Sequence, residues 1–267
     1  MTDAITLQHV TSKDGTTIAF DRLGSGPPVV LVCGGAVDRH ANDPLANLLA
    51  TDFTVYNFDR RGRGDSGDTP PYAVEREVED IDAVVEAVGG SACLWGISSG
   101  GALALWATAE LPIGRITKLA MYEPPFFVDP AAAGPPPDTV AAYERFLADD
   151  RRDLAVEYFM SKVVRMPADF VEFAKTQPFW ADTEKIAHTL PYDGRVMEDY
   201  SIPRARAAKV QVPALVVAGG ADFPFMRETA QALAEALPQG EVRFLDGQGH
   251  NVEPTVLAPV LKEFFGS

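Results

Sequence analysis

The segment Leu94–Gly101 reads LWGISSGG and places two adjacent serines between glycines. It lies at the end of the apolar run Ser91–Ile97, which is typical of a buried strand, and the alanine-rich pattern GALALWATAE that follows is typical of a helix. The sequence therefore predicts a direct turn from a strand into a helix, with serine at its tip.

Spacing decides which serine a tight turn of this kind would present. The backbone on either side of the turn nearly touches, so the residues two before and two after a raised nucleophile must be small. Ser98 has Gly96 and Gly100 at those positions, whereas Ser99 would have Ile97. Ser98 is therefore the predicted nucleophile, and the alternative is a glycine-rich turn that only lets the helix pack closely on the strand.

Outward from this turn, strand-like runs alternate with helical patterns, which predicts an α/β fold with a mostly parallel, eight-stranded sheet and helices on both faces. The opening runs AITLQHV and TTIAFDRL indicate an antiparallel hairpin at one edge. The remaining strands are expected at residues 28–35, 53–59, 91–97, 116–124, 213–220 and 241–247, and helices at 72–88, 226–237 and 252–265.

One long segment, residues 126–208, has no strand pattern. It begins with the proline-rich DPAAAGPPPD and continues with amphipathic helical patterns near residues 140–147, 154–164 and 169–176. Ligands bind at the carboxyl edge of open α/β sheets, so we expect a helical lid or cap over that edge. The core would then consist of residues 1–125 and 209–267.

Composition limits the function classes. The 267 residues include 38 acidic and 23 basic side chains, and a net charge of −15 disfavours nucleic acid and anionic membranes as partners. No apolar run approaches the ~18 residues of a membrane span, and the N-terminus lacks the pattern of a signal peptide. Cys33 and Cys93 are expected as buried thiols in a cytoplasmic protein. No metal-ligand spacing or nucleotide motif is present, so no cofactor or metal is expected, and a homodimer is left open.

A serine nucleophile needs a base, and the chain has four histidines. His250, in LDGQGH after the last expected strand, belongs at the same sheet edge as Ser98 and is the predicted base. His188, in the lid, is a second candidate that could instead contact substrate. His9 lies in the first edge strand and His40 follows a glycine turn, so neither is favoured.

The base in turn needs a carboxylate that holds it in one tautomer. Asp222 directly follows an expected strand and gives the order serine, acid, histidine along the chain, so it is the predicted acid. Glu123, at the end of the preceding strand, is the alternative. Asp246 is nearer to His250 in sequence but is expected to end its strand or cap a turn.

Acyl chemistry also needs N–H groups aimed at an oxyanion. We expect these from the backbone of Ser99, at the start of a helix, and of Gly35, in the glycine turn after the strand 28–35; the alternative is that these glycines only form a turn. The walls of a substrate pocket are expected from side chains of the lid and from the residue after Asp222, although these side chains could equally form the core of the lid. They are Phe126, Phe127, Phe179, Trp180, His188, Tyr192 and Phe223.

Several short motifs follow one another along the chain: the glycine turn LVCGG, the turn DRRGRGDS at 59–66, the elbow GISSG, the helical insertion, GGAD and GQGH. In this the chain resembles the α/β-hydrolase fold superfamily from end to end, and is similar to its compact bacterial members, which include esterases, carbon–carbon bond hydrolases and cofactor-free haloperoxidases. The resemblance implies Ser98 as nucleophile, Asp222 as acid, His250 as base, and Gly35 and Ser99 as the oxyanion hole.

The sequence departs from this superfamily at Cys33, where a histidine is usual, and at Ile97, where a polar or aromatic residue is frequent, and both departures imply a drier pocket. The arginines of DRRGRGDS are expected to pair with nearby acidic residues in a structural role. Related enzymes with an alkyl-enzyme mechanism carry aspartate at the elbow, so Ser98 excludes epoxide hydrolase and haloalkane dehalogenase chemistry.

These features favour a serine hydrolase acting on a small-molecule acyl substrate, namely a small and largely apolar ester, lactone or thioester. The same triad could serve acyl transfer, perhydrolysis, carbon–carbon cleavage or a lyase or isomerase step. A non-catalytic ligand-binding scaffold is the alternative from another class.

Overall fold

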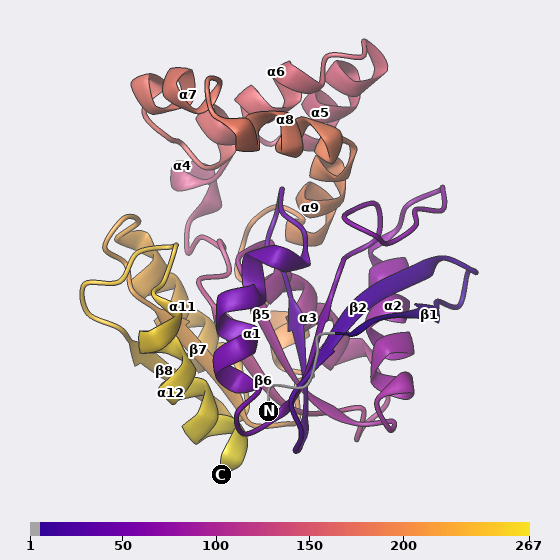
Figure 1. The fold of residues 1–267 in the computed structure, drawn as a ribbon. Helices are drawn as coiled ribbons and strands as arrows, with labels where there is room; N and C mark the ends of the chain where they lie inside the picture. The colour runs from indigo at the N-terminus through magenta and orange to yellow at the C-terminus, as the bar shows by residue number, and fades with distance from the viewer. Residues whose placement is uncertain (1–5) are drawn as a thin grey trace.

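A computed structural model describes residues 6–267, which form one eight-stranded sheet in the order β1-β2-β4-β3-β5-β6-β7-β8 (Figure 1). Strands β1 and β2 form an antiparallel hairpin, β2 runs antiparallel to β4, and every other neighbouring pair is parallel. The predicted fold class is confirmed, although the first two residues of the run AITLQHV lie outside the described residues. The strands are β1 (Thr6–Thr11), β2 (Thr17–Leu23), β3 (Pro28–Val32), β4 (Thr54–Phe58), β5 (Ala92–Ile97), β6 (Ile116–Tyr122), β7 (Ala214–Ala218) and β8 (Gly240–Phe244).

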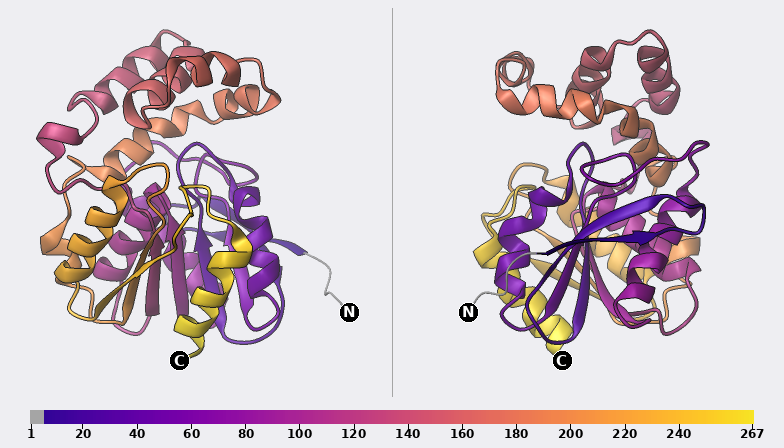
Figure 2. Two further views of the ribbon diagram at one scale, coloured as in Figure 1. Left: turned by 90° about the vertical axis from the view of Figure 1, so that its left-hand side faces the viewer. Right: turned by 45° about the vertical axis from the view of Figure 1, so that its right-hand side comes forward.

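Helices cover both faces of the sheet (Figures 1 and 2). One face carries α1 (Asp43–Leu49) and α12 (Pro254–Gly266), and the other carries α2 (Val74–Ala87), α3 (Ser99–Glu110) and α11 (Phe225–Ala236). The periodic patterns predicted α2, α11 and α12 within two residues at each end. They did not predict α1, which is only seven residues long and follows a short 3₁₀ turn, η1 (Arg39–Asn42).

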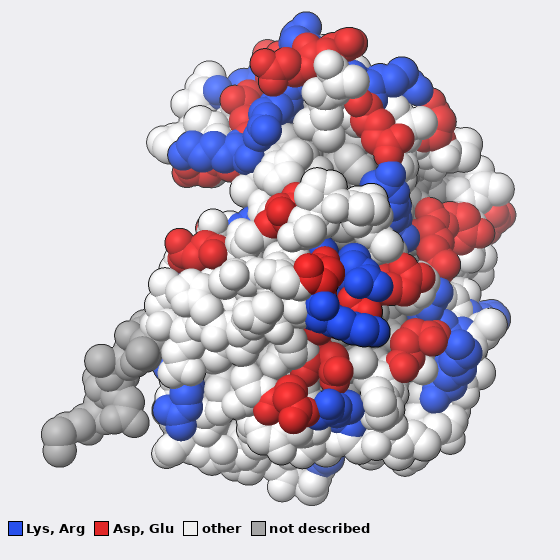
Figure 3. Space-filling model, turned by 90° about the vertical axis from the view of Figure 1, so that its right-hand side faces the viewer, with Lys and Arg blue, Asp and Glu red and all other residues white. Residues whose placement is uncertain are grey.

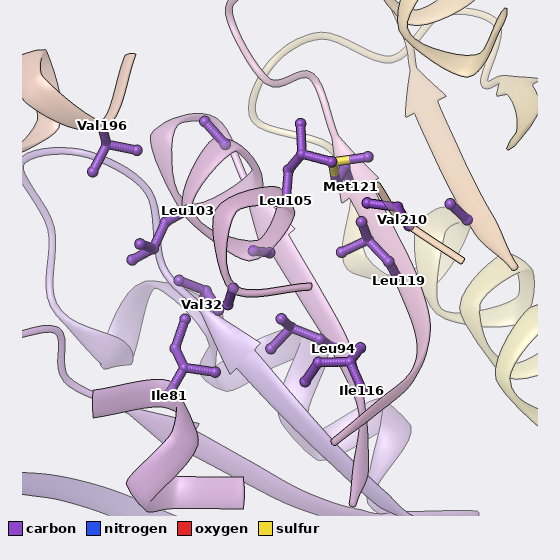
Figure 4. Close-up of a cluster of buried hydrophobic side chains, with 14 of the residues drawn as sticks. Val32, Ile81, Leu94, Leu103, Leu105, Ile116, Leu119, Met121, Val196 and Val210 are labelled. Carbon is purple, nitrogen blue, oxygen red and sulfur yellow. The ribbon is translucent and has the colours of Figure 1, made fainter. Parts of the chain in front are cut away.

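The central strands are apolar on both sides because helices bury both faces. Residues of β3, β5 and β6 alternate between two cores, and Leu94 and Met121 point into the core beneath α2, α3 and α11 (Figure 4). Trp95 and Tyr122 belong to the opposite core with α1 and α12. Burial of these strand side chains fixes the sheet, and thereby the positions of the loops at its carboxyl edge.

A helical insert, residues 126–208, separates β6 from β7 and lies above the carboxyl edge of the sheet (Figures 1 and 2). Apart from an isolated bridge between Phe127 and Ser201, the described chain forms no β-structure there. The three predicted helical stretches correspond to α5, α6 with η2, and α7, whereas α8 and α9 were not predicted. The helical elements are α4 (Pro130–Ala133), α5 (Thr139–Ala148), α6 (Arg152–Tyr158), the π-helical η2 (Phe159–Val163), α7 (Ala168–Ala174), α8 (Pro178–Lys185), η3 (Ala187–Thr189), α9 (Leu190–Met197) and α10 (Arg204–Ala207).

Helix α9 is one of the parts of the insert that pack on the core. Val196 of α9 is buried in the same apolar cluster as Leu103 and Leu105 of α3 (Figure 4), and Met197 belongs to that cluster too. Packing at this contact therefore sets where the insert sits over the sheet.

The surface mixes charges of both signs. On the face drawn in Figure 3, Lys and Arg side chains lie beside Asp and Glu side chains over both the core and the insert. Within residues 6–267, no helix combines the length and the apolar character that crossing a membrane requires.

Candidate active site

Ser98 occupies the turn between β5 and α3 in a left-handed backbone conformation, with φ 57° and ψ −132°. Such a conformation is strained for a non-glycine residue and is the geometry of a nucleophile elbow. A Cβ added to Gly96 would lie 2.3 Å from the carbonyl oxygen of Gly100, and one added to Gly100 would lie 2.3 Å from that of Cys33. The turn therefore needs glycine at both positions that the sequence singled out.

His250 lies in the loop between β8 and α12, and its ring makes a hydrogen bond to a carboxylate. Its Nδ1 is 2.8 Å from Oε2 of Glu123, a carboxylate directly after β6 that is only 1% exposed. The other oxygen of Glu123, Oε1, accepts hydrogen bonds from the backbone N–H groups of Gly219 (3.0 Å) and Gly220 (2.9 Å). Three donors thus hold the carboxylate, and an Nδ1–H donated to it leaves Nε2 of His250 as the basic nitrogen.

The predicted contact between Asp222 and the imidazole is wrong. Asp222 is exposed, and its Oδ2 accepts a hydrogen bond from the backbone N–H of His250 (3.0 Å) instead of the ring. Its carboxylate lies against the chain just before the histidine, since a Cβ added to Gly249 would be 2.0 Å from Asp222 Oδ2. Asp222 therefore holds the loop, and the sequence alternative Glu123 holds the ring.

Two further contacts fix the histidine loop. The hydroxyl of Tyr122 donates to the carbonyl of Gly249 (2.6 Å), and the ring of Phe223 meets the imidazole edge to face with centroids 5.9 Å apart. Asp246, the other acidic residue considered, is exposed and pairs with Arg227 at the surface. The imidazole is one-quarter exposed, with its Nδ1 side closed off by the carboxylate.

Ser98 and His250 line one cavity of about 1060 Å³ together with Gly35 and Ser99, the two residues predicted to supply oxyanion donors. Ser99 is the first residue of α3, and the first N–H groups of a helix have no partner within the helix. Most of the remaining lining is apolar and comes from the insert, from the segment around Asp222 after β7, and from α12. It includes Phe127, Phe159, Met160, Phe170, Phe179, Met197, Phe223, Phe225 and Leu257.

Among the predicted pocket walls, Phe127, Phe179 and Phe223 line the cavity, and four others do not. Phe126 is buried in the core under α11, and Trp180 in the core of the insert. Tyr192 stacks on Tyr72, with ring centroids 3.8 Å apart, and His188 lies beside Asp68. Those four predictions are corrected, because the presence of a ring in the sequence does not tell whether it points to the cavity, to the core or to another side chain.

A buried ionic cluster lies next to the cavity and was not predicted as part of the site. Arg60 and Arg63 come from the turn DRRGRGDS, Glu77 from α2 and Asp193 from α9, and each is at most 6% exposed. Arg60 binds Glu77 through two hydrogen bonds (2.7 and 2.8 Å) and Asp193 through one (2.7 Å). Asp193 also accepts hydrogen bonds from Arg63 (2.8 Å) and from the hydroxyl of Ser99 (2.8 Å).

Two cations and two anions balance within this cluster. Burial by itself would raise the pKa of Asp193, but Arg63 and Arg60 hold that pKa below its usual value. The pKa of Glu77 is likewise low, because Arg60 outweighs the effect of burial. Both carboxylates are therefore ionised at neutral pH. The prediction that these arginines pair with acidic residues is confirmed. That Asp193 of the insert is one of the partners could not be predicted, because nothing in the sequence distinguishes it from the other acidic residues.

One group of side chains among residues 6–267 brings three potential metal-ligand atoms within 4.8 Å of one another: Asp21, His40 and Asp43. Asp21 already accepts a hydrogen bond from Arg39 (2.7 Å), and Nδ1 of His40 bonds to Asp43 (2.9 Å). These ligand atoms are engaged within the protein, so we assign no metal to the group.

The match to known proteins agrees with this architecture. The model of the alpha/beta hydrolase family matches residues 29–260. The chain belongs to this family. An alpha/beta hydrolase from Sphaerobacter thermophilus DSM 20745 shares 50% sequence identity with it, with a TM-score of 0.90 over 97% of this chain and 100% of that one. The fold is thus that of an alpha/beta hydrolase.

Two relatives of this alpha/beta hydrolase carry enzyme names. A pimeloyl-acyl-carrier-protein methyl ester esterase from Xanthomonas campestris pv. campestris is 28% identical over 243 residues, which are 86% of this chain and 90% of that protein. A thermophilic esterase from Thermogutta terrifontis is 22% identical, with a TM-score of 0.74 over 97% of both chains, and shows the likeness of fold.

Proposed function

We propose that this alpha/beta hydrolase is a serine esterase that cleaves small, largely apolar carboxylic esters, lactones or thioesters through an acyl-enzyme on Ser98. The observation that carries the proposal is the hydrogen bond between His250 Nδ1 and the buried Glu123, at the edge of a cavity that Ser98 also lines. An imidazole held in this tautomer presents Nε2 as a base toward the cavity.

In the proposed reaction, Nε2 of His250 takes the proton of the Ser98 hydroxyl, and the oxygen attacks the substrate carbonyl. The backbone N–H groups of Gly35 and Ser99 receive the oxyanion of the tetrahedral intermediate, and Glu123 stabilises the imidazolium ion. His250 then protonates the leaving alcohol or thiol. A water molecule, deprotonated by His250, attacks the acyl-enzyme and releases the acid.

The substrate class follows from the lining of the cavity. Apart from the reacting groups, the walls are mainly Phe, Met, Val and Leu side chains, and burying apolar substrate surface against them stabilises the complex by roughly 25 cal/mol per Å². The helical insert supplies many of these walls and would act as a lid. The methyl ester esterase and the esterase among the relatives support an ester as substrate.

The proposal is tested by labelling the purified protein with a fluorophosphonate and locating the adduct by mass spectrometry. We expect one adduct, on Ser98. Ser98→Ala should abolish both the adduct and the hydrolysis of p-nitrophenyl butyrate, while Ser99→Ala, which removes the neighbouring hydroxyl, should still be labelled. An adduct on Ser99, or full hydrolysis by Ser98→Ala with an unchanged circular dichroism spectrum, would refute the proposal.

A further inference from the structure

A carboxylate of the helical insert binds one of the two residues that are proposed to stabilise the oxyanion and lies close to the other. Oδ1 of Asp193, on α9, accepts the hydroxyl of Ser99 (2.8 Å), 94 positions away in the sequence. A Cβ added to Gly35 would lie 3.1 Å from Asp193 Oδ2 and 3.3 Å from Ser99 Oγ. The Asp193 carboxylate therefore sits between the loop after β3 and the first turn of α3.

Arg63 extends this contact along the loop after β3. Its Nη2 binds Asp193 (2.8 Å), while its Nη1 donates to the carbonyl oxygens of Gly34 (2.6 Å) and Val37 (3.3 Å). These two carbonyls flank Gly35 and Ala36, and Ala36 has a left-handed φ of 58°. Arg63 thus holds a strained loop at two points, and Asp193 holds Arg63.

The geometry matters because an oxyanion hole works only when its donors are already placed. Donors must lie about 2.7–3.1 Å from the developing oxyanion, and small misplacements at a reacting centre cost about 100-fold in rate. Arg60 also reaches the Ser99 hydroxyl (3.3 Å) and is itself locked by Glu77. One buried network therefore connects the Ser99 hydroxyl, and the carbonyl groups on either side of Gly35 and Ala36, to the insert.

We propose that Asp193 is a positioning residue for the oxyanion hole, so that the hole is correctly formed only while α9 is docked on the core. This inference rests on the proposed function. It assigns to the insert a role in the chemical step beyond that of covering the cavity. Asp193 acts through Ser99 and Arg63 and does not touch the reacting atoms.

Two variants test the inference. Ser99→Ala keeps the backbone N–H and every charge but loses the link to Asp193; we expect kcat to fall about tenfold with KM within twofold. Asp193→Asn weakens the hydrogen bonds to both Ser99 and Arg63, and we expect a fall in kcat of about 100-fold. The affinity for an alkyl boronic acid, which places an oxygen where the oxyanion forms, should fall by the same factors as kcat.

The matched control is Trp106→Phe, which removes a different hydrogen bond to the same helix, from Trp106 Nε1 to the carbonyl of Val196 (3.0 Å). It should keep kcat within threefold. Circular dichroism and thermal melts establish folding, and Ser99→Ala decides the matter if Asp193→Asn does not fold.

The inference is overturned if Ser99→Ala keeps wild-type kcat, if its loss appears only in KM, or if Trp106→Phe lowers kcat as much. Failure of the proposed function gives a different result, namely that the wild-type protein itself takes no fluorophosphonate label on Ser98.

Discussion

At the scale of single residues, one non-glycine residue in each of the loops that end β3, β5 and β6 has a left-handed backbone conformation: Ala36 (φ 58°), Ser98 (φ 57°) and Glu123 (φ 44°). Each such conformation costs on the order of 1–3 kcal/mol and persists only where surrounding contacts impose it. Ala36 follows a proposed oxyanion donor, Ser98 is the proposed nucleophile, and Glu123 binds the histidine. Each of the loops that end β3, β5 and β6 thus contains one strained residue, and the insert contains others, among them Arg165 and Tyr200.

Gly100→Ala tests whether close packing imposes the elbow. Alanine is favoured over glycine inside a helix by about 1 kcal/mol, but its Cβ would lie 2.3 Å from the carbonyl oxygen of Cys33. We expect the free energy of unfolding, measured with urea, to fall by about 2 kcal/mol or more.

Gly67→Ala is the control for this variant, since its added Cβ would meet no atom closer than 3.5 Å. It should change the free energy of unfolding by less than about 1 kcal/mol. A Gly100→Ala protein as stable as the wild type would contradict the view that backbone contact holds the elbow.

The position of the acid was the residue-scale feature that the sequence left open. Glu123 and Asp222 follow the neighbouring strands β6 and β7, and both give the same order of serine, acid and histidine along the chain. Neither spacing nor order could separate them. The choice depends on how each strand leaves the sheet, and the left-handed turn at Glu123 directs its carboxylate to the ring.

At the scale of elements, buried ion pairs attach the turn DRRGRGDS to α2. Arg61 is fully buried and binds Asp80 through two hydrogen bonds (2.8 and 2.7 Å) and Asp14 through one (2.9 Å). Burial raises the pKa of Asp80 to about 6, and the hydrogen bonds and charge of Arg61 oppose that rise. The carboxylate is therefore costly to ionise, and Arg61 makes its ionised form tolerable.

Arg61→Leu should lower the free energy of unfolding by about 3–5 kcal/mol at pH 8, because Asp80 is left as a buried unpaired charge. A carboxyl group whose folded pKa is raised stabilises the fold below its unfolded pKa of about 3.9 and loses that contribution as pH rises through the folded pKa. Without Arg61 the pKa of Asp80 rises further, so the destabilisation should be smaller at pH 5 than at pH 8.

Urea unfolding at the two pH values measures this difference. Arg76→Leu is the control, since it breaks only a partly exposed pair with Glu79, whose side chains are 33% and 17% exposed, and should cost about 1 kcal/mol or less at either pH. Equal destabilisation by Arg61→Leu at pH 5 and pH 8 would contradict the assignment of the loss to Asp80.

Elements with long periodic patterns were predictable, and those defined by tertiary contact were not. The sheet strands and α2, α11 and α12 follow from apolar runs and helical spacing. Helix α9 is eight residues long and has a proline in its first turn. Its sequence pattern does not show that one side of the helix packs on the core. Its position follows from Asp193 and Val196, whose partners are far away in sequence.

At the scale of the whole molecule, the insert is part of the same folded unit as the sheet. Helix α9 contributes Val196 and Met197 to the apolar core and Asp193 to the buried ionic cluster. Tyr192 of the same helix stacks on Tyr72, just before α2. Separating the insert would expose these apolar groups and leave Arg63 without its carboxylate.

We therefore expect thermal unfolding to be one cooperative transition. Far-ultraviolet circular dichroism, tryptophan fluorescence and loss of the proposed esterase activity should give coincident midpoints, with equal calorimetric and van't Hoff enthalpies. Two resolved transitions, with activity lost in the first while the sheet persists, would contradict the docking of α9 as part of a single folded unit.

The central claim of this account is that Glu123, rather than Asp222, orients His250 for reaction with Ser98. The most direct measurement compares kcat/KM for p-nitrophenyl butyrate in Glu123→Gln and Asp222→Asn, two variants that each replace a carboxylate by its amide. We predict a loss of about 10³–10⁴-fold in Glu123→Gln, because the imidazole loses its tautomer and its counter-charge, and less than about tenfold in Asp222→Asn. The reverse order, or equal losses in two folded variants, would contradict the claim.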